Sequence, residues 1–110
     1  MTVRAGYIYG EEFLKDCMRA YQFKREKKYD LAIDLFLKII DEFETESMTT
    51  GCGVPPGYYE EMAIIYRKLK LIEKEKQILV RFSNQKHGTG GVSLKLYERL
   101  GILNAKYPNL

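Results

Sequence analysis

Few side chains in this chain are spaced for catalysis or metal binding. The 110 residues include one histidine, His87, and two cysteines, Cys17 and Cys52, with 34 residues between them. No second cysteine or histidine stands at the short spacing that a zinc site or a redox CxxC motif requires. His87 has no acid or cysteine beside it in sequence that would form a pair of base and nucleophile. We therefore expect no metal, no cofactor and two free thiols, one packed on a helix and one exposed in a loop.

Two further patterns could support chemistry, and both have a simpler interpretation. Glu60 with Glu61, and Glu73 with Glu75, are pairs of carboxylates, but carboxylates on exposed helix faces usually only make a protein soluble. The segment GTGGVS at residues 88–93 places glycines before a helix, where backbone N–H groups can bind an anion. It lacks the lysine of a nucleotide-binding loop, and no strand precedes it. We expect a turn here, with anion binding beside Lys86 and His87 as the alternative, and we expect no enzymatic activity.

Four cationic side chains and one tyrosine form the set of residues whose chemistry fits a binding surface. Arginine presents a fork that matches two oxygens and lysine presents a point charge, so such a set favours carboxylates or phosphates. The alternative is that these side chains are solvated helix ends. The candidate binding residues are Tyr21, Lys24, Arg25, Arg67 and Lys68.

The elements that must position these residues are helices. Apolar residues recur at intervals of three and four in five segments, which is the mark of a helix with one buried face. The expected helices span residues 11–26, 29–44, 56–69, 72–85 and 93–107. Pro55 and Pro56 exclude a helix interior, so we expect a long loop over residues 44–57, with Pro56 opening the next helix. Ser93 is expected to cap the last helix, and residues 1–10 to form a flexible arm before one all-α domain at 11–107.

Two copies of one packing pattern stand 43 residues apart, the distance from Ala20 to Ala63. A small residue is followed three positions later by an aromatic one, Phe23 in the first copy and Tyr66 in the second. The small residue lets two helices approach, and large residues of the following helix fill the gap. These are Tyr29, Ala32 and Phe36 in the first copy and Ile72, Leu79 and Phe82 in the second.

This ordering resembles the tetratricopeptide repeat (TPR) family, whose unit is about 34 residues of two antiparallel helices. The segment AYQFKREKKYDLAIDLFLKII at residues 20–40 follows the family pattern closely. In the second copy, Glu75 stands where the family has alanine. The proline that closes each repeat in the family is missing from both copies unless Pro55 serves. The resemblance covers residues 11–86. It implies two helix hairpins in a short right-handed solenoid, with the last helix as a C-terminal cap.

The resemblance also implies a function. TPR-like proteins are scaffolds that bind proteins or peptides in a concave groove, here lined by the helices at 11–26 and 56–69. We therefore expect a protein-binding adaptor whose partner is a protein or peptide of acidic character. Side chains not needed for packing in that groove include Glu60 and Ile64 beside the five candidates.

Charge and size leave two alternatives open. The net charge of +3 is uneven, because residues 29–50 carry one Lys or Arg against six Asp or Glu, whereas the segments on both sides are basic. A nucleic-acid-binding surface could combine Tyr21, Lys24 and Arg25 with Lys27, Lys28 and the RKLK run at 67–70, but the acidic segment opposes it. Self-association into a homodimer is the other alternative, because two hairpins are fewer than the three repeats that usually bury the ends of a solenoid.

The chain has no uninterrupted apolar run of 18 or more residues, and MTVRAGYIYG lacks the order of a secretory signal. We expect a cytoplasmic protein with no membrane partner.

Overall fold

The computed structural model describes residues 10–110, and this part of the chain consists of five helices without a strand. The predicted all-α class is confirmed. Residues 1–9 of the expected arm lie outside the described residues. None of the helices in the described part is long and apolar enough to cross a lipid bilayer. The helices are α2 (Glu11–Arg25), α3 (Tyr29–Thr50), α4 (Gly57–Lys68), α5 (Ile72–Ser83) and α6 (Gly91–Lys106).

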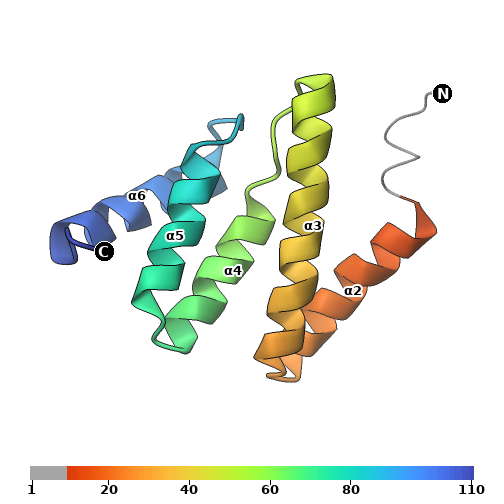
Figure 1. Ribbon diagram of the computed structural model, residues 1–110, viewed down its shortest axis with the longest axis horizontal. Coiled ribbons are helices and arrows are strands. Elements are labelled where there is room, and N and C mark those ends of the chain that lie inside the picture. Colours follow the sequence, from red (N-terminus) through yellow and green to blue (C-terminus); the bar gives the residue numbers. More distant parts are fainter. Residues whose placement is uncertain (1–9) are drawn as a thin grey trace.

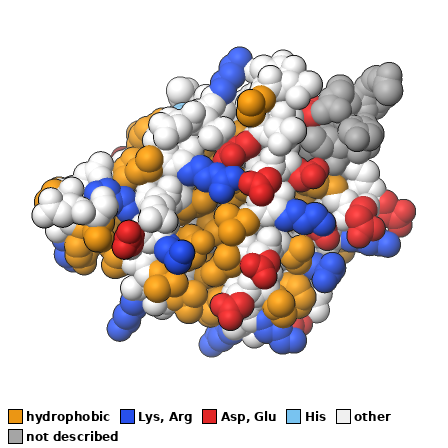
Figure 2. Space-filling model, in the orientation of Figure 1, with side chains coloured by type: hydrophobic (Ala, Val, Ile, Leu, Met, Phe, Trp, Pro, Cys, Tyr) orange, Lys and Arg blue, Asp and Glu red, His pale blue; other side chains and the backbone are white. Residues whose placement is uncertain are grey.

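The helices pack in the order of the chain. α2 packs on α3 and α4 packs on α5, while α4 also contacts α3 and α6 contacts both α5 and α4. Figure 1 shows α3 and α5 on the near side of the molecule and α2, α4 and α6 behind them. On the near face, hydrophobic side chains gather between α3 and α5 and charged side chains surround them (Figure 2). The arrangement is therefore two layers of helices, with α4 at the centre of the molecule.

The two small residues that carry the repeated pattern are both buried. Ala20 is 0% exposed and Ala63 is 1% exposed, so each lets its helix approach a neighbour closely. Large side chains from α3, α4 and α5 complete the core around them. Its largest fully buried apolar members are Tyr59, Phe36, Phe82, Ile39, Ile40, Met62, Ile65, Leu79 and Leu103.

α3 is longer than the sequence predicts. The helix was expected to end at residue 44, but it continues to Thr50, and the loop before α4 is correspondingly short. The hydroxyls of Thr49 and Thr50 donate to the carbonyl oxygens of Thr45 and Glu46 at 3.1 and 2.9 Å. The helix ends where Gly51 takes the left-handed backbone (φ 78°), which glycine adopts without steric cost. The prediction was wrong because polar Ser and Thr residues suit loops as well as helix ends.

Two predicted helix starts also differ from the structure. Ser93 does not cap α6, because the cap position belongs to Gly90, whose carbonyl oxygen accepts the N–H of Leu94 at 3.0 Å. Ser93 lies within the first turn and is 3% exposed. Pro56 immediately precedes α4 rather than forming its first residue.

The loop before α4 is anchored to the loop that follows α5. The N–H of Val54 donates to the carbonyl oxygen of Lys86 at 2.8 Å, and Val54 itself is buried. A Cβ atom built on Gly53 would lie 3.0 Å from the Cα of His87 and 3.2 Å from the Lys86 carbonyl oxygen. Glycine at position 53 therefore allows the two loops to touch.

Substituting two glycines should change stability in opposite directions. Gly53→Ala is expected to destabilise by about 1–2 kcal/mol, because backbone atoms must shift to admit the new Cβ. Gly101→Ala should stabilise by about 0.5–1 kcal/mol, because Gly101 lies inside α6 and its added Cβ would meet nothing within 4 Å. Urea denaturation of both variants measures the two free energies of unfolding. A stabilising Gly53→Ala would contradict the close contact between the loops.

Candidate binding surface

Tyr21 is half-buried in an aromatic cluster that joins α2, α3 and α4. Its ring meets Phe36 edge-on with centroids 5.3 Å apart and lies 6.2 Å from the ring of Tyr58. The hydroxyl of Tyr58 donates to the Sγ atom of Cys17 at 3.6 Å. Burial, together with the charge of Glu61, raises the pKa of the Tyr21 phenol. Tyr21 therefore contributes to helix packing and leaves only part of its ring for a ligand.

Lys24 reaches from α2 to α4, where its ammonium group forms an ion pair with Glu61. The two side chains are 24% and 19% exposed. A charge pair that is partly removed from water interacts more strongly than an exposed pair. Lys24 is thus neutralised within the protein and fastens α2 to α4.

Arg67 is also paired within the protein, through a carboxylate that is wholly buried. Its Nε atom lies 3.0 Å from Oε2 of Glu75, and the Glu75 side chain is 0% exposed. Arg99 of α6 binds the same carboxylate with two hydrogen bonds, Nε to Oε2 at 2.8 Å and Nη2 to Oε1 at 3.1 Å. Bidentate pairs of this kind are among the strongest and most directional in proteins. The Glu75 cluster, consisting of Glu75, Arg67 and Arg99, joins α4, α5 and α6.

Arg25 and Lys68 differ from Lys24 and Arg67, because both are exposed and form no ion pair within residues 10–110. They lie in the last turns of α2 and α4, where a cation interacts favourably with the helix dipole. Of the four predicted cations, two therefore connect helices and two remain available to a ligand. Their role in binding stays a prediction.

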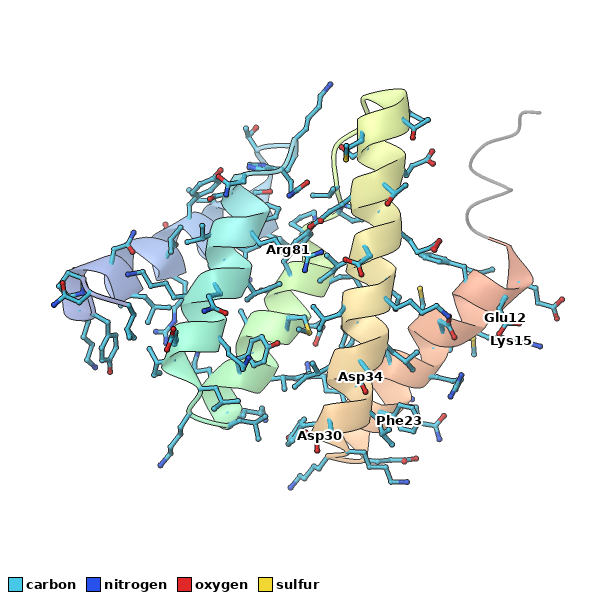
Figure 3. The ribbon with its side chains drawn as sticks, viewed as in Figure 1. Glu12, Lys15, Phe23, Asp30, Asp34 and Arg81 are labelled. Carbon is cyan, nitrogen blue, oxygen red and sulfur yellow. The ribbon has the colours of Figure 1, made fainter. Side chains whose placement is uncertain are left out.

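A second charge cluster joins α3, α4 and α5. Arg81 binds Glu44 with two hydrogen bonds, Nε to Oε2 at 2.8 Å and Nη2 to Oε1 at 3.0 Å, and binds Asp41 at 2.6 Å. The hydroxyl of buried Tyr59 donates to Oε2 of Glu44 at 2.7 Å. Figure 3 shows Arg81 reaching from α5 toward α3. Burial and the Glu44 carboxylate both raise the pKa of Tyr59.

The structure contains a groove of about 260 Å³ between α4 and α6, which we call the α4–α6 groove. Apolar side chains from both helices line it, together with charged side chains at its rim. The lining residues are Glu60, Ala63, Ile64, Arg67, Lys95, Leu96, Glu98, Arg99 and Ile102. Of the five candidate binding residues, Arg67 lines this groove, and so do Glu60 and Ile64, which the sequence analysis also placed in the predicted groove.

The α6 residues Lys95, Arg99 and Ile102 were missed by the sequence prediction. One signal could have identified Arg99. Glu75 lies three residues after Ile72 and four before Leu79, so it falls on the buried face of α5. A buried carboxylate requires cationic or hydrogen-bonding partners, so a search for arginines facing α5 would have included Arg99.

The cysteines and the histidine were the other candidates for chemistry. The thiols of Cys17 and Cys52 are free, Cys17 half-buried on a helix and Cys52 exposed in a loop, as predicted. His87 stacks on Phe82 with centroids 4.3 Å apart, and its Nε2 atom lies 2.8 Å from the Tyr97 hydroxyl. Within residues 10–110, no group of three or more His, Cys, Asp or Glu side chains is arranged to hold a metal ion.

Comparison of the chain with protein-family models, with curated proteins and with solved structures found no match.

Removing either side of the Glu75 cluster should have unequal effects. The double variant Arg67→Ala with Arg99→Ala is expected to lose about 3–5 kcal/mol of stability, because it leaves a buried carboxylate unpaired. Glu75→Ala should cost less, about 1–2 kcal/mol, because the arginines are 46% and 27% exposed and can turn to water. Guanidinium denaturation measures the free energy of unfolding of both variants. Lys68→Ala, at an exposed position, is the control and should lie within about 0.5 kcal/mol of wild type. If Glu75→Ala lost more stability than the double arginine variant, the buried carboxylate would not be the group whose pairing stabilises the fold.

We expect the protein to lose stability at alkaline pH because Tyr59 is buried. Its pKa in the folded protein is raised above the unfolded value of about 10, so the folded state retains a proton that the unfolded state releases. The stabilisation is complete below about pH 10 and declines as pH rises, by up to about 1.4 kcal/mol per pH unit. Tyr59→Phe should flatten this decline. Urea denaturation between about pH 9 and 11 measures the slopes, and equal slopes would contradict the assignment.

Proposed function

We propose that this protein is a non-enzymatic, TPR-like scaffold that binds a protein or peptide in the α4–α6 groove. The observation that carries the proposal is the composition of that groove. Ile64 and Ile102 offer apolar contact area. Lys95 offers a positive charge that has no ion pair within residues 10–110, and Arg67 and Arg99 together carry one charge more than the single carboxylate that they share. Ile102 is 55% exposed, so its side chain is accessible to a ligand in the groove.

An acidic peptide is the ligand that fits best. Arg67 and Arg99 are held in place by Glu75, so an incoming carboxylate would meet guanidinium groups whose conformations are already restricted. Restricting side chains before binding lowers the entropic cost of association. Lys95 adds an exposed charge from α6. The TPR likeness supports the same proposal, since helix pairs packed in chain order leave a face for a ligand.

A crosslinking experiment tests this function. A photo-reactive amino acid placed at Ile102 should capture a protein partner in cells that express the chain, and the same group at Val80 should not. Val80 is 38% exposed on α5 and lies outside the groove, so it serves as a matched control. Each captured partner is then titrated against wild type and Lys95→Glu by calorimetry. A loss of affinity of about tenfold is expected if a carboxylate is near Lys95. Equal capture at both positions, or affinity unchanged by Lys95→Glu, would contradict the proposal.

Self-association is a second candidate, favoured by a separate observation on α6. Leu94 is 58% exposed and Tyr97 is 42% exposed, whereas other side chains of α6 pack on α4 and α5. A second copy packing on this surface would cover both side chains.

Light scattering at high micromolar concentration tests self-association. A dimer mass is expected for wild type and a monomer mass for Leu94→Asp, because a buried, unpaired carboxylate opposes association. Glu98→Asp on the same helix is the control and should leave the mass unchanged. A monomeric wild type would remove this candidate.

A further inference from the structure

A second groove lies on the near face of the molecule, between α3 and α5. Leu37 of α3, Tyr66 of α4 and Ile78 of α5 line a hollow of about 180 Å³, and polar side chains of α5 complete its lining. A larger hollow of about 420 Å³ lies at the end where α3 begins. It is lined by Lys27, Lys28, Tyr29, Asp30, Leu31 and Leu69. We call these hollows together the α3–α5 groove. Figure 2 shows the hydrophobic side chains gathered between the two helices.

The apolar surface of the α3–α5 groove is open to solvent at one end. Leu31 is 48% exposed and Leu69 is 37% exposed. α3 and α5 both pack on α4, and Tyr66 of α4 lines the hollow between them. An apolar hollow with exposed leucines at its end is the kind of surface that accepts apolar side chains of a partner.

A row of carboxylates follows the α3 side of this groove. Asp30, Asp34 and Asp41 are spaced by four and seven residues, so they share one face of α3 over about 16 Å. Asp41 is paired with Arg81, whereas Asp30 and Asp34 are exposed and form no ion pair within the described part of the chain. Figure 3 shows Asp30 and Asp34 on the near side of α3. Two negative charges are thus available along one edge of an apolar groove.

We propose that the α3–α5 groove binds a partner protein through an amphipathic helix with Lys or Arg residues along one edge. Apolar side chains of this helix contact Leu31, Leu37 and Leu69, and its cations face Asp30 and Asp34. Lys74 stands on the α5 side of the groove, so the partner's positive charges are confined to the edge that faces α3. This pattern distinguishes the partner from a uniformly basic segment.

The charges of the groove decide among classes of ligand. Its unpaired charges in the described part of the chain are Asp30 and Asp34 along α3, Lys27 at the open end and Lys74 on α5. The carboxylates repel the phosphates of nucleic acids and of anionic lipids, and the lysines repel a uniformly cationic peptide. A helix whose cations are confined to the edge that faces Asp30 and Asp34 avoids both repulsions.

The α3–α5 groove is also separate from the α4–α6 groove. Ile64 and Tyr66 are two positions apart on α4, which places them about 200° apart around the helix axis. A ligand can therefore occupy this groove independently of the proposed function of the other.

Titration of the full chain with a designed peptide tests the proposal. The probe is a helical peptide of about five turns, with Leu along one face, Lys along one edge and Gln elsewhere. Amide shifts in ¹⁵N spectra are expected to change along α3 and α5 and in the turn before Leu31. The matched peptide with Glu in place of Lys should bind at least about tenfold more weakly, because it places like charges opposite Asp30 and Asp34.

Two double variants with the same change of net charge locate the binding site. Asp30→Lys with Asp34→Lys should weaken binding of the Lys peptide by about tenfold or more, whereas Glu11→Lys with Glu12→Lys should retain most of the affinity. Glu11 and Glu12 are exposed acids in the first turn of α2 and line neither of the two grooves. Equal loss in both variants, or shifts confined to other helices, would overturn the proposal. Shifts along α3 and α5 that depend on protein concentration without peptide would also overturn it, because a second copy would then be the occupant.

Discussion

Carboxylates held by cations of neighbouring helices connect every part of this fold. Asp16 of α2 is 3% exposed and binds Lys38 of α3 at 2.8 Å. Glu44 links α3 to α4 and α5 through Tyr59 and Arg81, and Glu75 links α5 to α4 and α6. A buried carboxylate is costly unless its partners stay in position, so each cluster restricts how its helices can slide or rotate. The relative placement of the helices depends on these contacts as well as on the apolar core.

The same contacts determine which charges remain for ligands. Lys24 and Arg67 look like free surface cations in the sequence, yet each is bound to a glutamate of another element. Two of the four carboxylates in the second half of α3, those of Asp41 and Glu44, are likewise bound by Arg81. Among the charged side chains that form no ion pair in the described part of the chain, Lys95 lines the α4–α6 groove, whereas Asp30 and Asp34 lie on α3 beside the α3–α5 groove. This separation underlies the two proposed surfaces.

Helices were predictable wherever the spacing of apolar residues was regular. The spacing from Phe13 to Ala20 and from Leu31 to Phe43 identified α2 and the first part of α3, because those residues repeat with the helical period. The last turns of α3 were missed, since Thr49 and Thr50 stabilise the helix through their own hydroxyls and carry no apolar signal. The binding residues were harder to predict, because the spacing of residues along one helix does not show which side chains of another helix they contact.

The amino-acid sequence alone determined the all-α class, the number of helices in the described part and the burial of Ala20 and Ala63. Each of these follows from short-range periodicity and side-chain size, which are local properties. The tertiary structure alone decided that Glu75 is shared by Arg67 and Arg99, that α4 and α6 enclose a groove, and that α3 and α5 enclose another. Those features depend on contacts between residues far apart in the chain, which only the packing of the helices brings together.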